Sequence, residues 1–88
     1  MDHEVVDRVR TVIRAIPAGE VLSYGEVADR AGLRSARLVG RVLAEYGEGL
    51  PWHRVVRADG TPTPHLASRQ LALLHAEGVR IRNGRVRG

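Results

Sequence analysis

Two short helix patterns, joined by a tight connection, constrain the fold of this chain more than any other feature. Ser23 and, three residues later, Glu26 match a capping box, so we expect a helix to begin there and to end at Gly32. Ser35 can cap a second helix that runs to about Tyr46. Two short helices joined by a glycine-containing turn of about four residues are typical of a helix-turn-helix. Because many domains that do not bind DNA contain such a corner, the pattern by itself leaves the function open.

The second of these helices has two unlike faces. At about 100° per residue, one face is apolar and is expected to point into the core; it consists of Leu38, Val39, Val42, Leu43 and Tyr46. The opposite face is small except for two arginines; it consists of Ala36, Arg37, Gly40, Arg41 and Ala44. Small side chains let a helix approach a bulky partner closely, and the arginines can reach phosphates or bases. The alternative is an ordinary solvated face that tolerates a glycine at a cost of roughly 1 kcal/mol.

The remaining segments complete a mainly α-helical domain with small β elements. A first helix, capped by Asp2, is expected over residues 2–16, where Pro17 stops it. A last helix is expected from about residue 66 to residue 77, followed by Gly78 as its C-terminal cap. Asn-Gly between alternating residues is a strong hairpin signal. Short strands are therefore expected at residues 21–22 and 54–57, and at 79–82 and 85–87 on either side of Asn83-Gly84.

Composition limits the core and the chemistry. Of the 88 residues, 43% are hydrophobic, but none is phenylalanine, so the core must be aliphatic. A chain of this length favours a single domain, residues 1–88. The absence of cysteine excludes disulfides, thiolate metal sites and cysteine nucleophiles. There is no apolar run near 18 residues, so no membrane span is expected. The acidic N-terminus is unlike a signal peptide, which favours a cytoplasmic location. The four histidines lie far apart in the sequence, so no metal site is expected, and no cofactor either.

The charge of the chain favours a polyanionic partner. Net charge is +4, and all 14 basic residues are arginine, whose planar fork suits phosphate. Arginine-only usage could equally reflect a GC-rich genome. The arginines of the C-terminal hairpin share one face, with no acid nearby in the sequence. They could form a wing that touches DNA, or an edge strand that charge protects from aggregation.

The segment Pro51-Trp52-His53-Arg54-Val55 holds the only tryptophan of the chain. Pro51 fixes its own φ and restricts its neighbour, so a rigid turn is expected to set the direction of Trp52. Without further information, a lone tryptophan is more often a core residue than a binding residue.

Four motifs, in this order, resemble the DNA-binding, active-site domain of the O6-alkylguanine-DNA alkyltransferases. That family carries Pro-Cys-His-Arg-Val at its active site, and here Trp52 replaces the cysteine, which resembles the alkyltransferase-like, non-enzymatic branch. The resemblance implies a winged helix-turn-helix-like fold. The motifs are Ile16-Pro17-Ala18-Gly19-Glu20-Val21-Leu22-Ser23-Tyr24-Gly25, Ala36-Arg37-Leu38-Val39-Gly40, Pro51-Trp52-His53-Arg54-Val55 and Leu73-Leu74-His75-Ala76-Glu77-Gly78.

The resemblance implies a DNA-damage sensor. Such a protein binds duplex DNA in the minor groove, flips O6-alkylguanine into a pocket and hands it to nucleotide excision repair proteins. The chemistry points the same way, because alkyl transfer needs a thiolate and the only sulfur here is that of Met1. We therefore expect no alkyl transfer. A monomer is expected, since no extra helix is available for dimerisation.

The resemblance also assigns roles to residues. Trp52 would stack on the flipped base, an interaction worth about 1–3 kcal/mol per base. Arg37 would enter the duplex in place of the guanine, and Tyr24 would push the phosphate that rotates the nucleotide outward. Without the thiol, His53 and Glu77 are expected to hold the pocket loop. The expected lesion pocket is Trp52, Tyr24, Pro51, His53, Val55 and Glu77, and the expected DNA contacts are Arg37, Tyr24, Ser35, Ala36, Gly40, Arg41 and Arg54.

Two departures from the family leave questions open. Tyr46-Gly47 stands where the family often has Asn-Pro, and the segment 61–65 differs from the glycine-rich loop that lines the alkyl pocket. The accepted alkyl groups are thus undetermined, and His65 could face the pocket. A sequence-reading transcription regulator, an enzyme that uses His53 and Glu77 as general acid and base, and a protein-interaction module are the alternatives.

Overall fold

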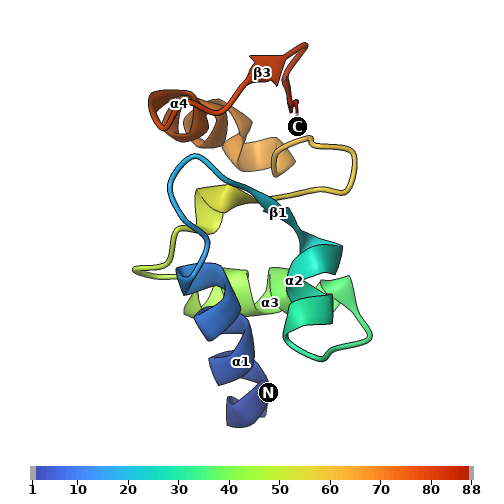
Figure 1. Cartoon of the computed structure of the whole chain (residues 1–88). Coiled ribbons are helices and arrows are strands. Elements are labelled where there is room, and N and C mark those ends of the chain that lie inside the picture. The colour runs from blue at the N-terminus through green and yellow to red at the C-terminus, as the bar shows by residue number, and fades with distance from the viewer. Residues whose placement is uncertain (1, 88) are drawn as a thin grey trace.

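The computed structural model describes residues 2–87 and shows a mainly helical domain with small β elements, as expected (Figure 1). Its long axis measures 36 Å and the two shorter axes 23 Å each. Four α-helices and two short 3₁₀ helices account for most of the described residues. They are α1 (His3–Arg14), α2 (Tyr24–Arg30), α3 (Ala36–Tyr46), η1 (Trp52–Arg54), η2 (Pro64–Leu66) and α4 (Ala67–Ala76). The strands are β1 (Leu22–Ser23), β2 (Val55–Val56), β3 (Ile81–Arg82) and β4 (Arg85–Val86).

The helix-turn-helix is built by the caps that the sequence predicts. Ser23 Oγ accepts a hydrogen bond from the Glu26 amide at 3.1 Å, and the Glu26 carboxylate accepts one from the Ser23 amide at 2.8 Å. The Ser35 hydroxyl accepts a bond from the Arg37 amide at the start of α3. Gly32, with φ of +73°, makes the turn after α2. Both helices therefore have a defined start, and the corner between them is fixed by local chemistry.

Helix α1 ends earlier than predicted. It stops at Arg14, with Ala15 as its C-terminal cap, rather than at Ile16. The helical conformation is disfavoured for the residue before a proline, so Pro17 keeps Ile16 out of the helix. Ile16 nevertheless remains buried at 4% exposure and belongs to the core.

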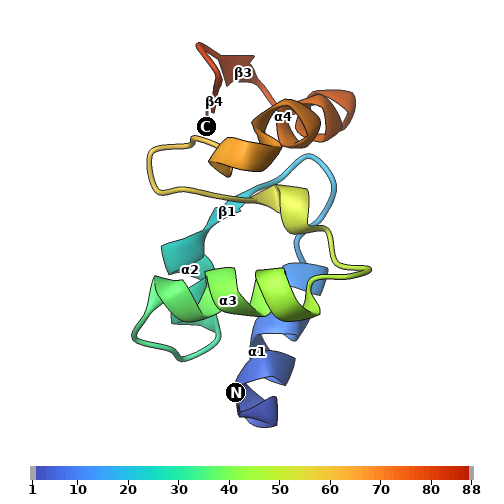
Figure 2. The same cartoon turned by 180° about the vertical axis from the view of Figure 1, so that it is seen from behind.

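A short parallel pairing joins two segments that are far apart in the chain. Leu22 in β1 pairs with Val55 in β2, and Ser23 pairs with Val56. The predicted strand 54–57 is too long, because Arg54 belongs to η1 and Arg57 lies outside β2. This pairing places the start of α2 next to the segment that carries Trp52, and Figure 2 shows α3 below that segment on the same side of the molecule.

The core is aliphatic, as the composition requires, and has two parts. The larger part lies between α1, α2 and α3 and includes Val9, Ile13, Val27 and Val39, each 0% exposed. The smaller part lies beneath α4 and the C-terminal hairpin and consists of Val56, Leu74 and Val79. Within residues 2–87, no helix is long and apolar enough to cross a bilayer.

Two residues of the predicted core face of α3 lie outside the core. Tyr46 is 36% exposed, and Leu38 is only half-buried. Val39 and Val42 are fully buried, so the predicted face is correct but narrower than expected. Tyr46 is the last residue of the helix. The next buried residue along the chain is Leu50, which is 5% exposed.

The C-terminal hairpin forms as the Asn-Gly pair predicts. Strands β3 and β4 are antiparallel, and the turn residues Asn83 and Gly84 have φ of +53° and +73°. The amide of Val86 donates a hydrogen bond of 2.9 Å to the carbonyl of Gly60, which attaches the hairpin to the preceding turn.

Gly60→Ala tests this attachment. Gly60 has φ of +85°, and a Cβ there would lie 2.7 Å from the carbonyl oxygen of Val86. Gly84→Ala is the matched control, because it has φ of +73° but no atom within 4 Å of a Cβ. We expect Gly84→Ala to lower the free energy of unfolding by about 1–2 kcal/mol. Gly60→Ala should cost at least about 1 kcal/mol more, since β4 must move. Urea denaturation measures both, and equal losses would contradict the attachment.

Candidate nucleic-acid interface and its pocket

A small cavity of about 170 Å³ opens between α3, η1 and η2. Gly40 and Ala44 supply its floor from the small-residue face of α3, and Trp52 forms a wall. The polar groups at its edge come from Tyr24, Thr63 and His65. The complete lining is Tyr24, Gly40, Leu43, Ala44, Trp52, Thr63, His65 and Leu66. A cavity of this size suits a flat group the size of a single base, since pockets for drug-sized ligands begin at about 300 Å³.

Trp52 is positioned by the rigid turn that Pro51 was expected to form. Pro51 has φ of −75° and ψ of 63°, and the Trp52 amide donates a bond of 2.8 Å to the carbonyl of Leu50. This is an inverse γ-turn. The indole meets the ring of His53 edge to face at 6.0 Å, and the Arg69 guanidinium carbon lies 5.9 Å from its centroid. A cation over the ring face is an electrostatically favourable contact, so Trp52 is held by backbone and side-chain contacts together.

Tyr24 stands at the start of α2 and is tied to the opposite edge of the cavity. Its hydroxyl lies 3.0 Å from the hydroxyl of Thr63, within hydrogen-bonding distance. This bond links α2 to the proline-containing segment between β2 and α4. The cavity edge is therefore closed by residues 39 positions apart in the chain.

Behind Trp52, a network of ionic hydrogen bonds centres on Glu77. Arg54 donates to both carboxylate oxygens, from Nε at 3.0 Å and from Nη2 at 2.6 Å. The His53 Nε2 atom lies 2.9 Å from the same carboxylate, and the Gly19 amide donates to it at 3.4 Å. A third nitrogen of Arg54, Nη1, donates to the carbonyl of Ile16 at 2.9 Å. Three of the four sequence motifs therefore meet at this carboxylate.

The network shifts the pKa values of Glu77 and Arg54. The hydrogen bonds from Arg54 lower the pKa of Glu77 to about 2, with smaller contributions from His53 and Gly19. The same contact raises the pKa of Arg54. The side chains of His53, Arg54 and Glu77 are only 13–17% exposed. Glu77 is thus an anion at neutral pH, held by cationic and backbone donors.

The structure distributes the residues of the predicted lesion pocket over three places. Trp52 and Tyr24 line the cavity, whereas His53 and Glu77 lie in the network behind it, and Pro51 forms the turn. Val55 is a correction: it is 0% exposed in the core and does not line the cavity. Its pairing with Leu22 directs its side chain into the core.

The residues predicted to contact DNA also lie in different parts of the structure. Ala36, Arg37 and Arg41 are exposed on α3, Gly40 lines the cavity and Ser35 caps the helix. Arg54 points inward, because both ends of its guanidinium are bound to Glu77 and to the Ile16 carbonyl. The alternative that Arg54 serves the fold is the one the contacts support.

Gln70 is a site residue that sequence reasoning missed. It is 0% exposed, accepts a bond from the Thr63 amide at 2.9 Å, and donates to the carbonyls of His53 and Val55 at 3.1 and 2.8 Å. It therefore connects the cavity edge to η1 and β2. A glutamine on a helix gives no sequence signal of such a role, because its partners lie 7 to 17 residues away.

The ionic network predicts a pH dependence of stability. The folded-state pKa of Glu77 lies at about 2, below its ordinary value of 4.5. Its contribution is thus complete above about pH 4.5 and is lost as the pH falls toward 2. We expect the free energy of unfolding of wild type to fall by up to about 3 kcal/mol more than that of Glu77→Gln over this interval. Urea denaturation from pH 7 to pH 2.5 measures the difference, and parallel curves would contradict it.

Comparison with known proteins identifies the family of this chain. The family model described as the DNA binding domain of 6-O-methylguanine DNA methyltransferase matches residues 4–79. The chain therefore belongs to this family. It is 50% identical over 80 residues to a DNA base-flipping protein of Escherichia coli K12, which covers 84% of this chain. The chain spans about three-fifths of the length of that relative, 61%.

Within the family, the chain is similar to both alkyltransferase-like proteins and methyltransferases. It is 36% identical over 85 residues to Alkyltransferase-like protein 1 of Schizosaccharomyces pombe, covering 89% of this chain and 79% of that protein. The crystal structure of S. pombe Atl1 with damaged DNA containing O6-carboxymethylguanine matches with a TM-score of 0.83 and 32% identity, over 93% of this chain and 82% of that one. The Mycobacterium tuberculosis O6-methylguanine methyltransferase matches with a TM-score of 0.70 and 35% identity, over 94% and 52%.

Proposed function

We propose that this protein is a DNA-damage sensor without alkyl-transfer activity. It binds duplex DNA from the minor groove through α3, holds a flipped O6-alkylguanine in the cavity against Trp52, and leaves the alkyl group on the base. The observation that carries the proposal is the position of Trp52. It stands where the family motif has its cysteine, and it forms a wall of a base-sized cavity beside the small-residue face of α3.

The exposed face of α3 supports the proposed DNA contact. Arg37 lies in the first turn of α3 and is exposed, and Gly40 on the next turn lines the cavity. An arginine that enters the duplex could fill the space left by the flipped base, which offsets a flipping cost of a few kcal/mol. Arg41 lies 4.0 Å from Glu45 in an exposed ion pair, so it remains able to turn toward a phosphate.

The ionic network argues against hydrolytic catalysis by His53 and Glu77. Neither residue lines the cavity, and the Glu77 carboxylate already accepts bonds from Arg54, His53 and Gly19. A carboxyl whose pKa is about 2 is a poor general acid at neutral pH. We assign these residues to holding η1, and through it Trp52, in place.

The remaining parts of the proposal rest on the resemblance to the alkyltransferase-like branch. A sensor that removes nothing must pass the lesion on, so nucleotide excision repair proteins are the proposed partners. We propose a monomer in the cytoplasm, acting on DNA there. The relatives described above are base-flipping, alkyltransferase-like and methyltransferase proteins, and they give no support to a transcription regulator.

Arg37→Ala tests the proposed contact. Fluorescence anisotropy at fixed salt would compare a duplex with one guanine to the same duplex with O6-methylguanine. We expect wild type to prefer the lesion, and Arg37→Ala to weaken lesion binding by at least about tenfold, or 1.4 kcal/mol. Arg14→Ala on α1 is the control for loss of one positive charge. Equal affinities of wild type for the two duplexes would refute the sensor, and unchanged affinity of the variant would refute the role of Arg37.

Gly40→Ala tests separately whether Gly40 affects the stability of the protein and the binding of the lesion. A Cβ at Gly40 meets no atom within 4 Å, so no internal contact requires the glycine. Alanine should therefore raise the free energy of unfolding by about 0.5–1 kcal/mol. Because Gly40 lines the cavity, we expect the added methyl to take up space there and to weaken lesion binding several-fold. A variant that is more stable and binds the lesion as well as wild type would contradict the assignment of the cavity.

A further inference from the structure

The C-terminal hairpin has one apolar and one cationic face. Ile81 and Val86 form a cross-strand pair that packs on the smaller part of the core. Arg82 and Arg85 form the next pair, and the Arg87 amide donates to the Arg80 carbonyl at 2.9 Å. Cross-strand partners, and residues two apart in a strand, lie on the same side. All four arginines therefore belong to the face opposite the core.

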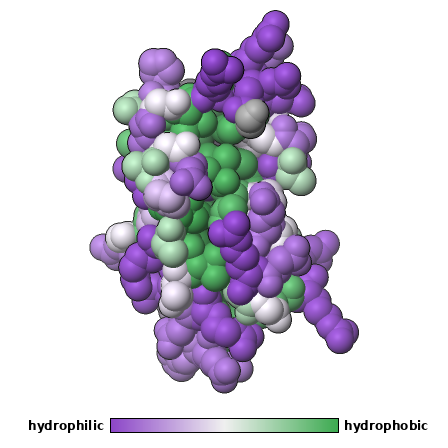
Figure 3. All heavy atoms as spheres, in the orientation of Figure 1, coloured by the Kyte–Doolittle hydropathy of each residue, from purple (hydrophilic) through white to green (hydrophobic). Residues whose placement is uncertain are grey.

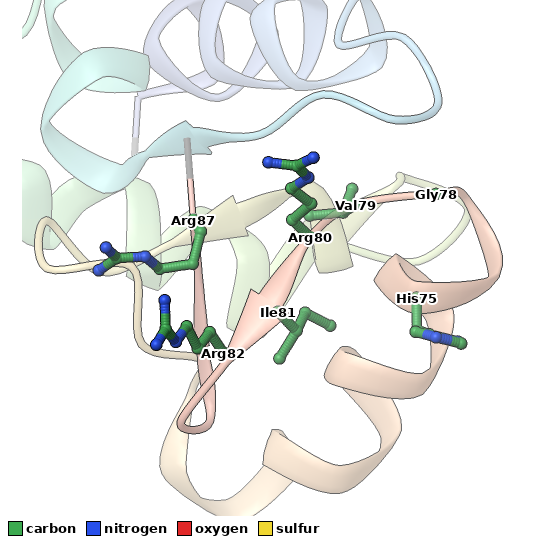
Figure 4. A pocket seen from close by; sticks show the side chains of 7 residues that line it. All are labelled: His75, Gly78, Val79, Arg80, Ile81, Arg82 and Arg87. Carbon is green, nitrogen blue, oxygen red and sulfur yellow. The ribbon is translucent and has the colours of Figure 1, made fainter.

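Figure 4 shows this division for Arg82, Arg87 and Ile81. The side chains of Arg82 and Arg87 extend to the same side of the hairpin, and Ile81 extends to the other side, toward α4. Arg80, Arg82 and Arg87 border an open basin of about 640 Å³ that also includes His75 from the end of α4. Hydrophilic side chains gather at this end of the molecule in Figure 3.

The charge of this face is largely uncompensated within the described residues. Between residues 2 and 87, no carboxylate lies within 4 Å of Arg80, Arg82 or Arg87. One acid, Asp59, does lie near the hairpin, which corrects the expectation from sequence that there is none. Hydrogen bonds from Thr61 lower its pKa, with smaller contributions from Arg85 and Arg57. Like charges directly opposite each other destabilise a hairpin, so this arrangement has a cost that an external anion would relieve.

We propose that the cationic face of the hairpin binds the phosphodiester backbone of the duplex, on the flank of the site that α3 occupies. The inference rests on the proposed function in that duplex DNA is the ligand. Guanidinium groups bind phosphate oxygens through two parallel hydrogen bonds. A DNA strand offers a row of anions without cations, which matches a face on which Arg80, Arg82 and Arg87 have no carboxylate within 4 Å. An acidic protein surface usually interleaves both signs, so it matches this face less well.

The length of the molecule indicates how long a duplex must be to reach the hairpin. The hairpin lies at one end of the molecule, beyond α4, and α3 lies in the other half (Figures 1 and 2). The long axis of 36 Å corresponds to about one helical turn of DNA, roughly 10 base pairs. A duplex that extends about 5 base pairs, roughly half of this length, on each side of the lesion should end near the hairpin and offer it few phosphates. One that extends about 12 base pairs should reach it.

The test compares two double variants that lose the same charge. Arg82→Gln/Arg87→Gln removes two arginines of the cationic face, and Arg8→Gln/Arg14→Gln removes two exposed arginines of α1. Anisotropy titrations over a range of salt concentrations would use lesion-centred duplexes of about 10 and 25 base pairs, each with O6-methylguanine or guanine. The slope of log affinity against log salt changes by about 0.9 for each phosphate contact.

On the long duplex, we expect the hairpin variant to bind more weakly than wild type, with a salt slope shallower by about 1.8. On the short duplex the difference in slope from wild type should be clearly smaller, and the α1 variant should match wild type on both. An unchanged slope on the long duplex would overturn the proposal, as would an equal loss on both lengths. An unchanged slope together with aggregation of the variant would instead assign the arginines to edge protection. The preference for the lesion is read separately, so loss of that preference with the hairpin effect intact would refute the sensor alone.

Discussion

The carboxylate of Glu77 is the contact on which the arrangement of the pocket depends. It connects the end of α4 to the loop at Gly19 and to the two residues that follow Trp52, across as many as 58 positions of sequence. Arg54 extends this connection to the carbonyl of Ile16. Because Arg54 and His53 form η1 together with Trp52, fixing their side chains also fixes where the indole points. In a chain this small, which can bury only a modest core, one partly buried ionic network thus holds the pocket segment in place.

Two further contacts complete the frame around the cavity. The parallel pairing of β1 with β2 brings the start of α2, and so Tyr24, next to η1. Gln70 then joins the cavity edge at Thr63 to the backbone of His53 and Val55. The base-sized cavity is therefore bordered by groups held in place by hydrogen bonds, while α3 contributes Leu43 and the small residues Gly40 and Ala44. A site preorganised in this way gives up little side-chain freedom when it binds a base.

Features set by neighbouring residues could be predicted from the sequence, and features set by distant contacts could not. The caps at Ser23 and Ser35 and the hairpin at Asn83 depend on residues within a few positions, and all three form. Periodicity indicated the buried face of α3 but not how far the core covers it, which is why Tyr46 was misplaced. The inward direction of Arg54, the burial of Val55 and the role of Gln70 depend on partners that periodicity does not reveal. The motif resemblance identified the tryptophan and tyrosine of the cavity and left open whether His65 and the segment 61–65 face it. The fold places Thr63 and His65 in the cavity lining.

The central claim is that Trp52 packs on a flipped, alkylated base, and the chain contains no other tryptophan. Its fluorescence therefore reports on the cavity directly. The measurement is a titration of tryptophan emission with a duplex containing O6-methylguanine and with the same duplex containing guanine, both taken to saturation. Stacking of a base on the indole predicts strong quenching with the lesion duplex and clearly weaker quenching with guanine, with the alkyl group recovered intact on the DNA. Equal quenching by both duplexes at saturation, or loss of the alkyl group, would contradict the account.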